Sequence, residues 1–163
     1  MDNKYYTPTI EEFHIGFKYE ELITPIKGDP FWDTIIANYT DIEEAYTLDV
    51  NNGLKGLIRV KYLDKEDIES LGFEYYTTES FMKQPPVPIN NYFINKDWAL
   101  VENFNTGTIR ISEIEGLEHD KSLITHVWRL GDPKVRCFFL GTIKNKSELK
   151  KLLQQLNILQ NVK

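Results

Sequence analysis

The sequence predicts a single α+β domain over residues 1–163, built from a mostly antiparallel β-sheet, short helices and a C-terminal amphipathic helix packed on the sheet. Two observations predict this fold class: short alternating segments separated by turn residues, and two helices with clear start and stop signals. At 163 residues and 41% hydrophobic composition, the chain is long enough for one hydrophobic core.

The N-terminal segment combines a helical turn with a strand. Thr7 followed by Pro8 is a good N-cap and first-turn pair, which predicts one helical turn over 7–13. Residues 13–20 alternate between apolar and polar side chains, which is typical of a strand with one buried face. The side chains expected on that face are Phe13, Ile15, Phe17 and Tyr19.

The middle of the chain predicts a short strand over 31–39, a brief acidic helix over 41–48 and a turn over 51–53. A further strand over 56–63 then runs directly into a helix over 64–72.

The helix over 64–72 has signals at both ends. Asp64 is its expected N-cap, and Asp67 at the third position suits the positive end of the helix dipole. Leu63 and Ile68 occupy the positions of a hydrophobic staple, and Gly72 ends the helix.

The second half of the chain predicts antiparallel strands joined by turns. The proline-rich segment at 84–90 is expected to be a loop within the one domain, because each half of the chain would hold only about half of the core. The expected strands are 92–94, 98–104, 108–114, 127–130 and 134–143.

The C-terminal helix is the most legible element. Asn145 followed by Glu148 is the amide variant of a capping box, and at the other end Asn157 and Ile158 suit a left-handed Schellman stop. The apolar stripe between them has helical spacing and consists of Leu149, Leu152, Leu153 and Leu156.

We interpret this helix as a cover for the protein's own sheet; the alternative is a helix offered to a partner's groove. In either case a basic, polar face is left toward solvent, and it is a candidate partner-binding surface for an acidic protein. Its residues are Lys146, Lys150, Lys151, Gln154 and Gln155.

Charge and cysteine content limit the function classes. The net charge is −6, with +4 from residue 143 onward and −10 before it, which argues against a general phosphate-binding surface. Cys137, the single cysteine, stands next to two phenylalanines, so we expect a buried thiol on a strand in a reducing, cytosolic setting. We expect no export signal and no membrane span, since apolar runs are short.

No catalytic, metal or cofactor signature is recognisable. His14, His119 and His126 lack the spacing of a zinc site, and the P-loop, dinucleotide and nucleophile-elbow motifs are absent from the sequence. The helix over 64–72 resembles the first helix of a DNA-binding helix-turn-helix. However, residues 73–83 offer one lysine and strand-forming side chains where a recognition helix is needed.

A small-molecule alternative also remains open. A protein that sequesters a nucleotide signal in an aromatic-lined pocket would need clustered cations, although salt bridges explain distributed cations equally well. The candidates for such an anion-binding site are Arg59, Lys61, Arg110, Arg129 and Arg136, all on predicted strands.

Three stretches carry a resemblance: YTPTIEEFHIGFKYE, VKYLDKEDIESLGF and GTIKNKSELKKLLQQLNI. Together they resemble a group of short proteins, without an assigned activity, from Bacteroidetes bacteria and their phages, crAss-like phages among them. The resemblance implies a small accessory protein that acts in the host-cell cytoplasm or is carried in the phage particle. We therefore expect a non-enzymatic protein without a cofactor, which interferes with a host or defence function or assists assembly through protein contacts. A DNA-binding helix-turn-helix protein and an enzyme of unrecognised type are the further alternatives.

Overall fold

The computed structural model describes residues 4–50, 56–77, 89–94, 97–103, 106–128 and 132–159. The chain divides into two compact units, Met1–Tyr62 (unit 1) and Leu63–Lys163 (unit 2), and each is described by itself. Both hold an antiparallel sheet with short helices, so the predicted α+β class is confirmed. The prediction of one domain over 1–163 stays a prediction. The turn predicted at 51–53 and most of the loop predicted at 84–90 lie outside the described residues; Ile89 and Asn90 already belong to a strand.

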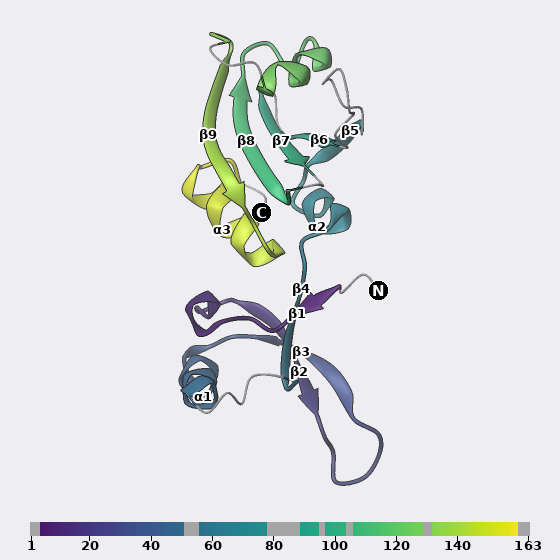
Figure 1. The fold of residues 1–163 in the computed structure, drawn as a ribbon, viewed down its shortest axis with the longest axis vertical. Coiled ribbons are helices and arrows are strands. Elements are labelled where there is room, and N and C mark those ends of the chain that lie inside the picture. The colour runs from purple at the N-terminus through teal and green to yellow at the C-terminus, as the bar shows by residue number, and fades with distance from the viewer. Residues whose placement is uncertain are drawn as a thin grey trace. The chain divides into compact units, whose positions relative to one another are not determined.

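Unit 1 is a four-stranded antiparallel sheet in the order β1-β4-β2-β3. The paired strands β2 and β3 form a long hairpin (Figure 1). The elements of unit 1 are β1 (Tyr5–Tyr6), the 3₁₀ turn η1 (Ile10–Glu12), β2 (Lys18–Ile23), β3 (Phe31–Ile36), α1 (Tyr39–Val50) and β4 (Ile58–Lys61).

The core of unit 1 lies on the side of the sheet that α1 and η1 occupy. Phe17 is fully buried, and its ring lies 5.1 Å from that of Phe13 and 6.4 Å from that of Tyr19. Ala45 of α1 and Val60 of β4 belong to the same cluster.

Two expectations for the N-terminal segment are wrong in detail. The helical turn is capped at Thr9 rather than Thr7. The strand begins at Lys18, because Gly16 has φ +86° and sits in a turn closed by a hydrogen bond from the Phe17 N–H to the His14 carbonyl. That turn leaves Ile15 71% exposed, so it does not face the core.

Unit 2 is a five-stranded antiparallel sheet in the sequential order β5-β6-β7-β8-β9. Each strand pairs with its neighbour in sequence, as consecutive strands usually do, although η2 separates β8 from β9 along the chain. The elements are α2 (Lys65–Glu69), β5 (Glu74–Thr77), β6 (Ile89–Ile94), β7 (Trp98–Asn103), β8 (Thr108–Ile114), the 3₁₀ helix η2 (Lys121–Trp128), β9 (Val135–Thr142) and α3 (Lys146–Gln155).

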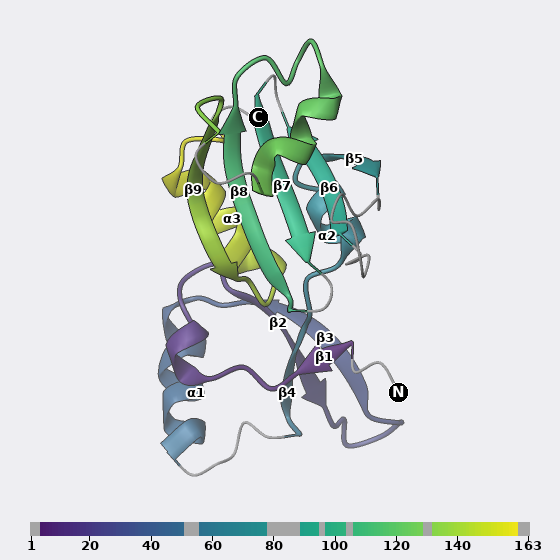
Figure 2. The ribbon, with the colours of Figure 1, turned by 45° about the horizontal axis from the view of Figure 1, so that its top comes forward.

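The sheet of unit 2 is covered on both faces. Helices α2 and α3 pack on one face through a cluster that includes Ile68, Leu149 and Leu153 together with Leu100 and Ile111 of the sheet. The other face packs against η2, and Figure 2 shows η2 in front of the strands and α3 behind them. The prediction that the C-terminal helix covers the sheet is therefore confirmed.

The helix ends form largely as the sequence predicts. The Asp67 N–H donates to the Asp64 carboxylate at 3.0 Å, and the Glu148 N–H donates to Asn145 Oδ1 at 2.9 Å. The Glu148 carboxylate accepts a hydrogen bond from the Lys144 N–H at 2.7 Å. A standard capping box would use the N–H of the N-cap residue itself, which is Asn145.

The stop of α3 is the predicted Schellman motif. Asn157 has φ 58°, and the Ile158 N–H donates to the Leu153 carbonyl at 2.9 Å. Ile158 itself is buried in the same cluster as Leu153. At the end of α2, Gly72 has φ +93°, which agrees with its predicted role as a stop.

Two expectations for unit 2 are corrected. Residues 127 and 128, expected in a strand, belong to η2, where Val127 is buried against the sheet. Cys137 lies on β9 as expected, but its thiol is exposed rather than buried. The reason is the position of β9 at the edge of the sheet, where the register shift between Ile111 and Ser112 changes which side chains face the core.

Glu102 of β7 carries a half-buried carboxylate. Burial is the main cause that raises the pKa of Glu102 above its ordinary value of 4.5, and Asp64 adds to the shift. The Asn90 side-chain amide, itself buried, donates to Glu102 Oε2 at 3.1 Å and opposes the shift.

We expect Glu102→Gln to raise the melting temperature at neutral pH by a few degrees, roughly the effect of 1 kcal/mol. The folded state binds the Glu102 proton more tightly than the unfolded chain, so stability is lost as pH rises above 4.5 and through the raised pKa. Glutamine keeps an acceptor for Asn90 without this loss. Melting curves at several pH values should show the gain shrinking below pH 4.5. The exposed Glu115→Gln is the control, and an equal gain at every pH would contradict the assignment.

Candidate functional site

Arg59 is held between two aromatic rings on one face of the unit 1 sheet. Its guanidinium carbon lies 3.9 Å from the centroid of the Tyr5 ring and 4.0 Å from the centroid of the Trp32 ring. Both Nη2 and Nε of Arg59 lie 2.7 Å from Glu20 Oε2. The four side chains come from β1, β4, β2 and β3 in that spatial order, so each strand supplies one of them.

The sheet pairing explains why these side chains meet. Glu20 lies directly opposite Arg59, while Tyr5 lies opposite Lys61, two residues farther along β4. Since side chains alternate between faces, all four belong to the face opposite the core residues Tyr19 and Val60. We call this side of the sheet the outer face and define it by Tyr5, Glu20, Trp32, Ile36, Leu57 and Arg59.

The outer face is ordered in advance of any contact. A cation over an aromatic ring is worth about 0.5–1 kcal/mol at an exposed site, and the charge-assisted bond to Glu20 restricts Arg59 further. Side chains already fixed lose less entropy when a partner binds. Tryptophan, tyrosine and arginine are also the residue types that most often dominate protein interfaces.

Among the described residues, large exposed hydrophobic side chains are more numerous in unit 1 than in unit 2. Ile36 is 67% exposed and Leu57 is 42% exposed, both on the outer face. Among the described residues, the large exposed hydrophobic side chains of unit 1 are Ile15, Ile26, Phe31, Ile36, Tyr39, Tyr46, Leu57 and Tyr62. The longer unit 2 exposes Tyr76, Phe138 and Leu140. Unit 1 is therefore the richer in surface suited to protein contact.

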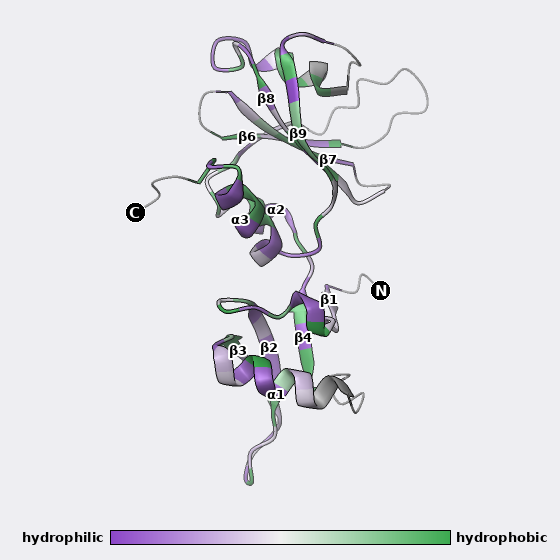
Figure 3. Cartoon of the chain, turned by 90° about the vertical axis from the view of Figure 1, so that its left-hand side faces the viewer, coloured by the Kyte–Doolittle hydropathy of each residue, from purple (hydrophilic) through white to green (hydrophobic). Residues whose placement is uncertain are grey.

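The predicted basic face of α3 does point to solvent. Lys150, Lys151, Gln154 and Gln155 are exposed and Lys146 is half-buried. Figure 3 shows the helix with hydrophilic and hydrophobic sides. In the described part of the chain, no ion pair involves Lys146, Lys150 or Lys151.

The candidate anion-binding residues occupy separate places. Arg59 and Lys61 share one face of β4 as predicted, but Glu20 already binds the Arg59 guanidinium. In unit 2, Arg136 lies directly opposite Glu113 and therefore shares its face of the sheet. Arg110 precedes Glu113 by three residues on the same strand, so its side chain lies on the other face. Arg129 lies outside the described residues.

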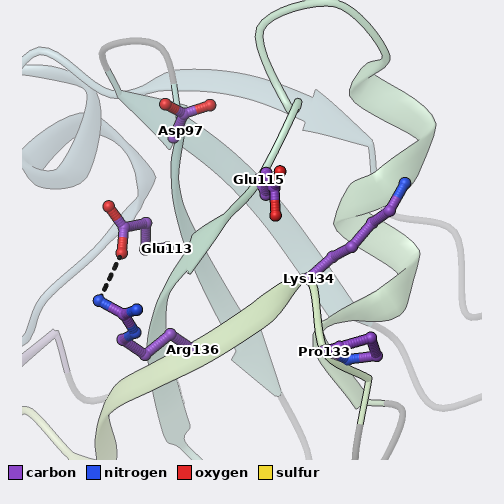
Figure 4. Close-up of a pocket in the computed structure, with 6 residues that line it drawn as sticks. All are labelled: Asp97, Glu113, Glu115, Pro133, Lys134 and Arg136. Atoms are coloured by element: carbon purple, nitrogen blue, oxygen red, sulfur yellow. Dashed lines mark ion pairs between the residues drawn. The ribbon is translucent and has the colours of Figure 1, made fainter.

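A shallow cleft of about 300 Å³ lies where β8 ends and β9 begins (Figure 4). The ion pair between Glu113 and Arg136 spans 3.5 Å, and the Lys134 side chain points away from it. The remaining charged residues of the lining are Asp97 and Glu115. A lining with three carboxylates disfavours a phosphate ligand.

The histidines of the sequence form no metal-binding group in the part of the chain that the structure describes. Within the residues described, no group of three or more histidine, cysteine, aspartate and glutamate side chains is arranged to hold a metal ion. His14 Nδ1 lies 2.8 Å from the Glu12 carbonyl, and His119 lies 3.3 Å from the Glu118 carboxylate beside it. None of the described helices combines the length and apolar composition required to cross a bilayer.

The set formed by Tyr5, Glu20, Trp32 and Arg59 could not be predicted from the sequence. Arg59 appears there among the candidate cations, but its partners are up to 54 residues away along the chain and follow no motif. Comparison of the chain with models of known protein families, with curated proteins and with solved structures finds no match.

Proposed function

We propose that this protein is a non-enzymatic accessory protein that acts through protein contacts, with the outer face of unit 1 as its principal contact surface. The observation that carries the proposal is the Tyr5–Arg59–Trp32 stack on the same face as exposed Ile36 and Leu57. This surface combines fixed aromatic and cationic side chains with uncovered apolar area, as the centres of protein interfaces do.

The proposed setting follows the resemblance of the sequence to short proteins of Bacteroidetes and their phages. A partner would then be a host polypeptide or a phage polypeptide, bound in the cytoplasm or in the particle. Interference with a host or defence function and assistance in assembly both require such contacts. The basic face of α3 is a second candidate surface in the same proposal.

Affinity capture from Bacteroidetes lysate, with and without phage infection, tests the proposal. We expect one stoichiometric polypeptide with the unaltered protein and at least a tenfold loss for Ile36→Lys/Leu57→Lys, because two desolvated cations would face the partner. Ile15→Lys/Ile26→Lys is the matched control, since it adds the same charge at two exposed positions that lie before β2 and between β2 and β3.

Two further results distinguish the outer face from the basic face of α3, and protein binding from nucleotide sequestration. If capture is lost only in the Lys146→Glu/Lys150→Glu/Lys151→Glu variant, the contact surface is the basic face of α3. The proposal fails if no polypeptide is retained in any lysate. A nucleotide released on denaturation, detected by its ultraviolet absorbance, would instead support the sequestration alternative.

A further inference from the structure

Strand β3 forms an open edge of the unit 1 sheet. It is the last strand in the order β1-β4-β2-β3, and all six of its residues are at least partly exposed. In the described part of the chain no strand pairs with its outer side. Natural proteins usually protect such edges with lysine, proline, a bulge, very short length or an inward-pointing charge, and of these β3 (FWDTII) has only the charge of Asp33.

The edge carries an uncompensated negative charge. Asp33 lies directly opposite Glu21 on the same side of the sheet, an arrangement of like charges that destabilises a strand pair. Among the described residues, no cation is paired with either carboxylate. Burial raises the pKa of Tyr19 to about 12, and the carboxylates of Asp41, Glu21 and Glu44 add to this shift, so negative charge gathers around Tyr19 on the helix side.

The main-chain N–H of Thr34 has a local hydrogen-bond partner that an added strand can replace. The Thr34 N–H donates to the Asp33 carboxylate at 2.8 Å. An arriving strand can supply a main-chain carbonyl to that N–H, and a lysine or arginine on the strand can take the released carboxylate. The new main-chain hydrogen bond and the new ion pair would form at the neighbouring residues Thr34 and Asp33. A strand that carries a cation at this position is therefore favoured over a strand that does not.

We propose that the free edge of β3 binds an extended segment of a partner protein, bearing lysine or arginine, as an added strand of the unit 1 sheet. This inference rests on the proposed function and names the partner's chemistry. On the helix side the segment places cations beside Asp33 and Phe31. On the outer face it places apolar side chains beside Trp32 and Ile36, which alternate with Asp33 along β3.

A second copy of this chain is the less suitable occupant. Antiparallel pairing of two β3 strands would bring another Asp33 and another Glu21 to the same short interface. Four carboxylates without cations would then share one surface, and each close pair would be destabilising. The charge at the edge therefore favours a basic partner over self-association.

The test uses the full chain and a short labelled peptide of alternating lysine and valine, with binding followed by fluorescence anisotropy. We expect binding, protection of the Thr34 amide from hydrogen exchange, and roughly tenfold weaker binding to Glu21→Gln/Asp33→Asn. The matched control is Glu66→Gln/Glu115→Gln, which removes the same charge at exposed positions of unit 2 and should bind as the unaltered protein does.

Peptide controls separate strand addition from simple charge attraction. A lysine–proline peptide has equal charge but lacks the N–H of every second residue, the ones that face β3 when lysine lies beside Asp33, and it should not bind. Equal binding of the two basic peptides, or an equal loss in both double variants, overturns the proposal. So does self-association of the unaltered protein in sedimentation velocity, because the edge would then accept a second copy despite its charge.

Failure here is distinguishable from failure of the proposed function. If the lysine–valine peptide does not bind while the lysate polypeptide is still captured through Ile36 and Leu57, the outer face is the contact and the edge is not.

Discussion

Leu153→Asp is expected to unfold unit 2. The Leu153 side chain is fully buried in the cluster that joins α3 to the sheet. Removing a buried leucine alone costs about 2–5 kcal/mol. The aspartate adds an unpaired charge among apolar side chains, which costs several kcal/mol more. The sum is comparable with the whole stability of a small domain.

Circular dichroism and thermal melting of the variant provide the measurement. The neighbouring Gln154→Asp is the control, because Gln154 is exposed on the same helix and should keep the melting transition. A folded Leu153→Asp protein would mean that the apolar stripe faces outward and belongs to an interface. Leu152 and Leu156 are only partly buried, so aspartate there should cost less than at Leu153.

Phe17→Ala is expected to destabilise unit 1 by about 3–5 kcal/mol. Phe17 is fully buried and its ring lies within 6.4 Å of the rings of both Phe13 and Tyr19. A sheet and helix within 62 residues bury a small core, so a loss of this size removes most of its stability. Hydrogen exchange read by mass spectrometry should show protection lost over β2, β3 and β4.

The same experiment tests whether the chain folds as one domain. If the two units are independent, the peptides of unit 2 keep their protection in Phe17→Ala. Simultaneous loss in both units would support the single domain that the sequence predicts. Ile15→Ala serves as the control, because Ile15 is 71% exposed and its removal should change stability by less than about 0.5 kcal/mol.

Short-range signals account for the parts of the fold that were predictable. Asp64 and Asn145 cap their helices, and Asn157 takes the left-handed conformation, because each depends on groups within a few residues. Strand β9 was predictable as a strand, but the exposure of Cys137 was not. Exposure depends on the edge position and the register shift, which are properties of the assembled sheet.

The candidate surfaces were likewise predictable from the sequence only where they depend on local spacing. Lys150 and Lys151 were predictable as a solvent-facing pair because helical spacing places them opposite the leucine stripe. The stack of Arg59 between Tyr5 and Trp32 was not, since it requires the strand order β1-β4-β2-β3. No local pattern encodes that order.

By itself, the sequence determined the α+β class, the caps at Asp64 and Asn145 and the burial of the C-terminal helix against the sheet, because capping and periodicity are local. The tertiary structure alone decided that the chain forms two sheets, that β3 is an open edge and that Glu21 faces Asp33. These features depend on which strands become neighbours. That choice reflects the burial of whole faces rather than the preference of any single residue.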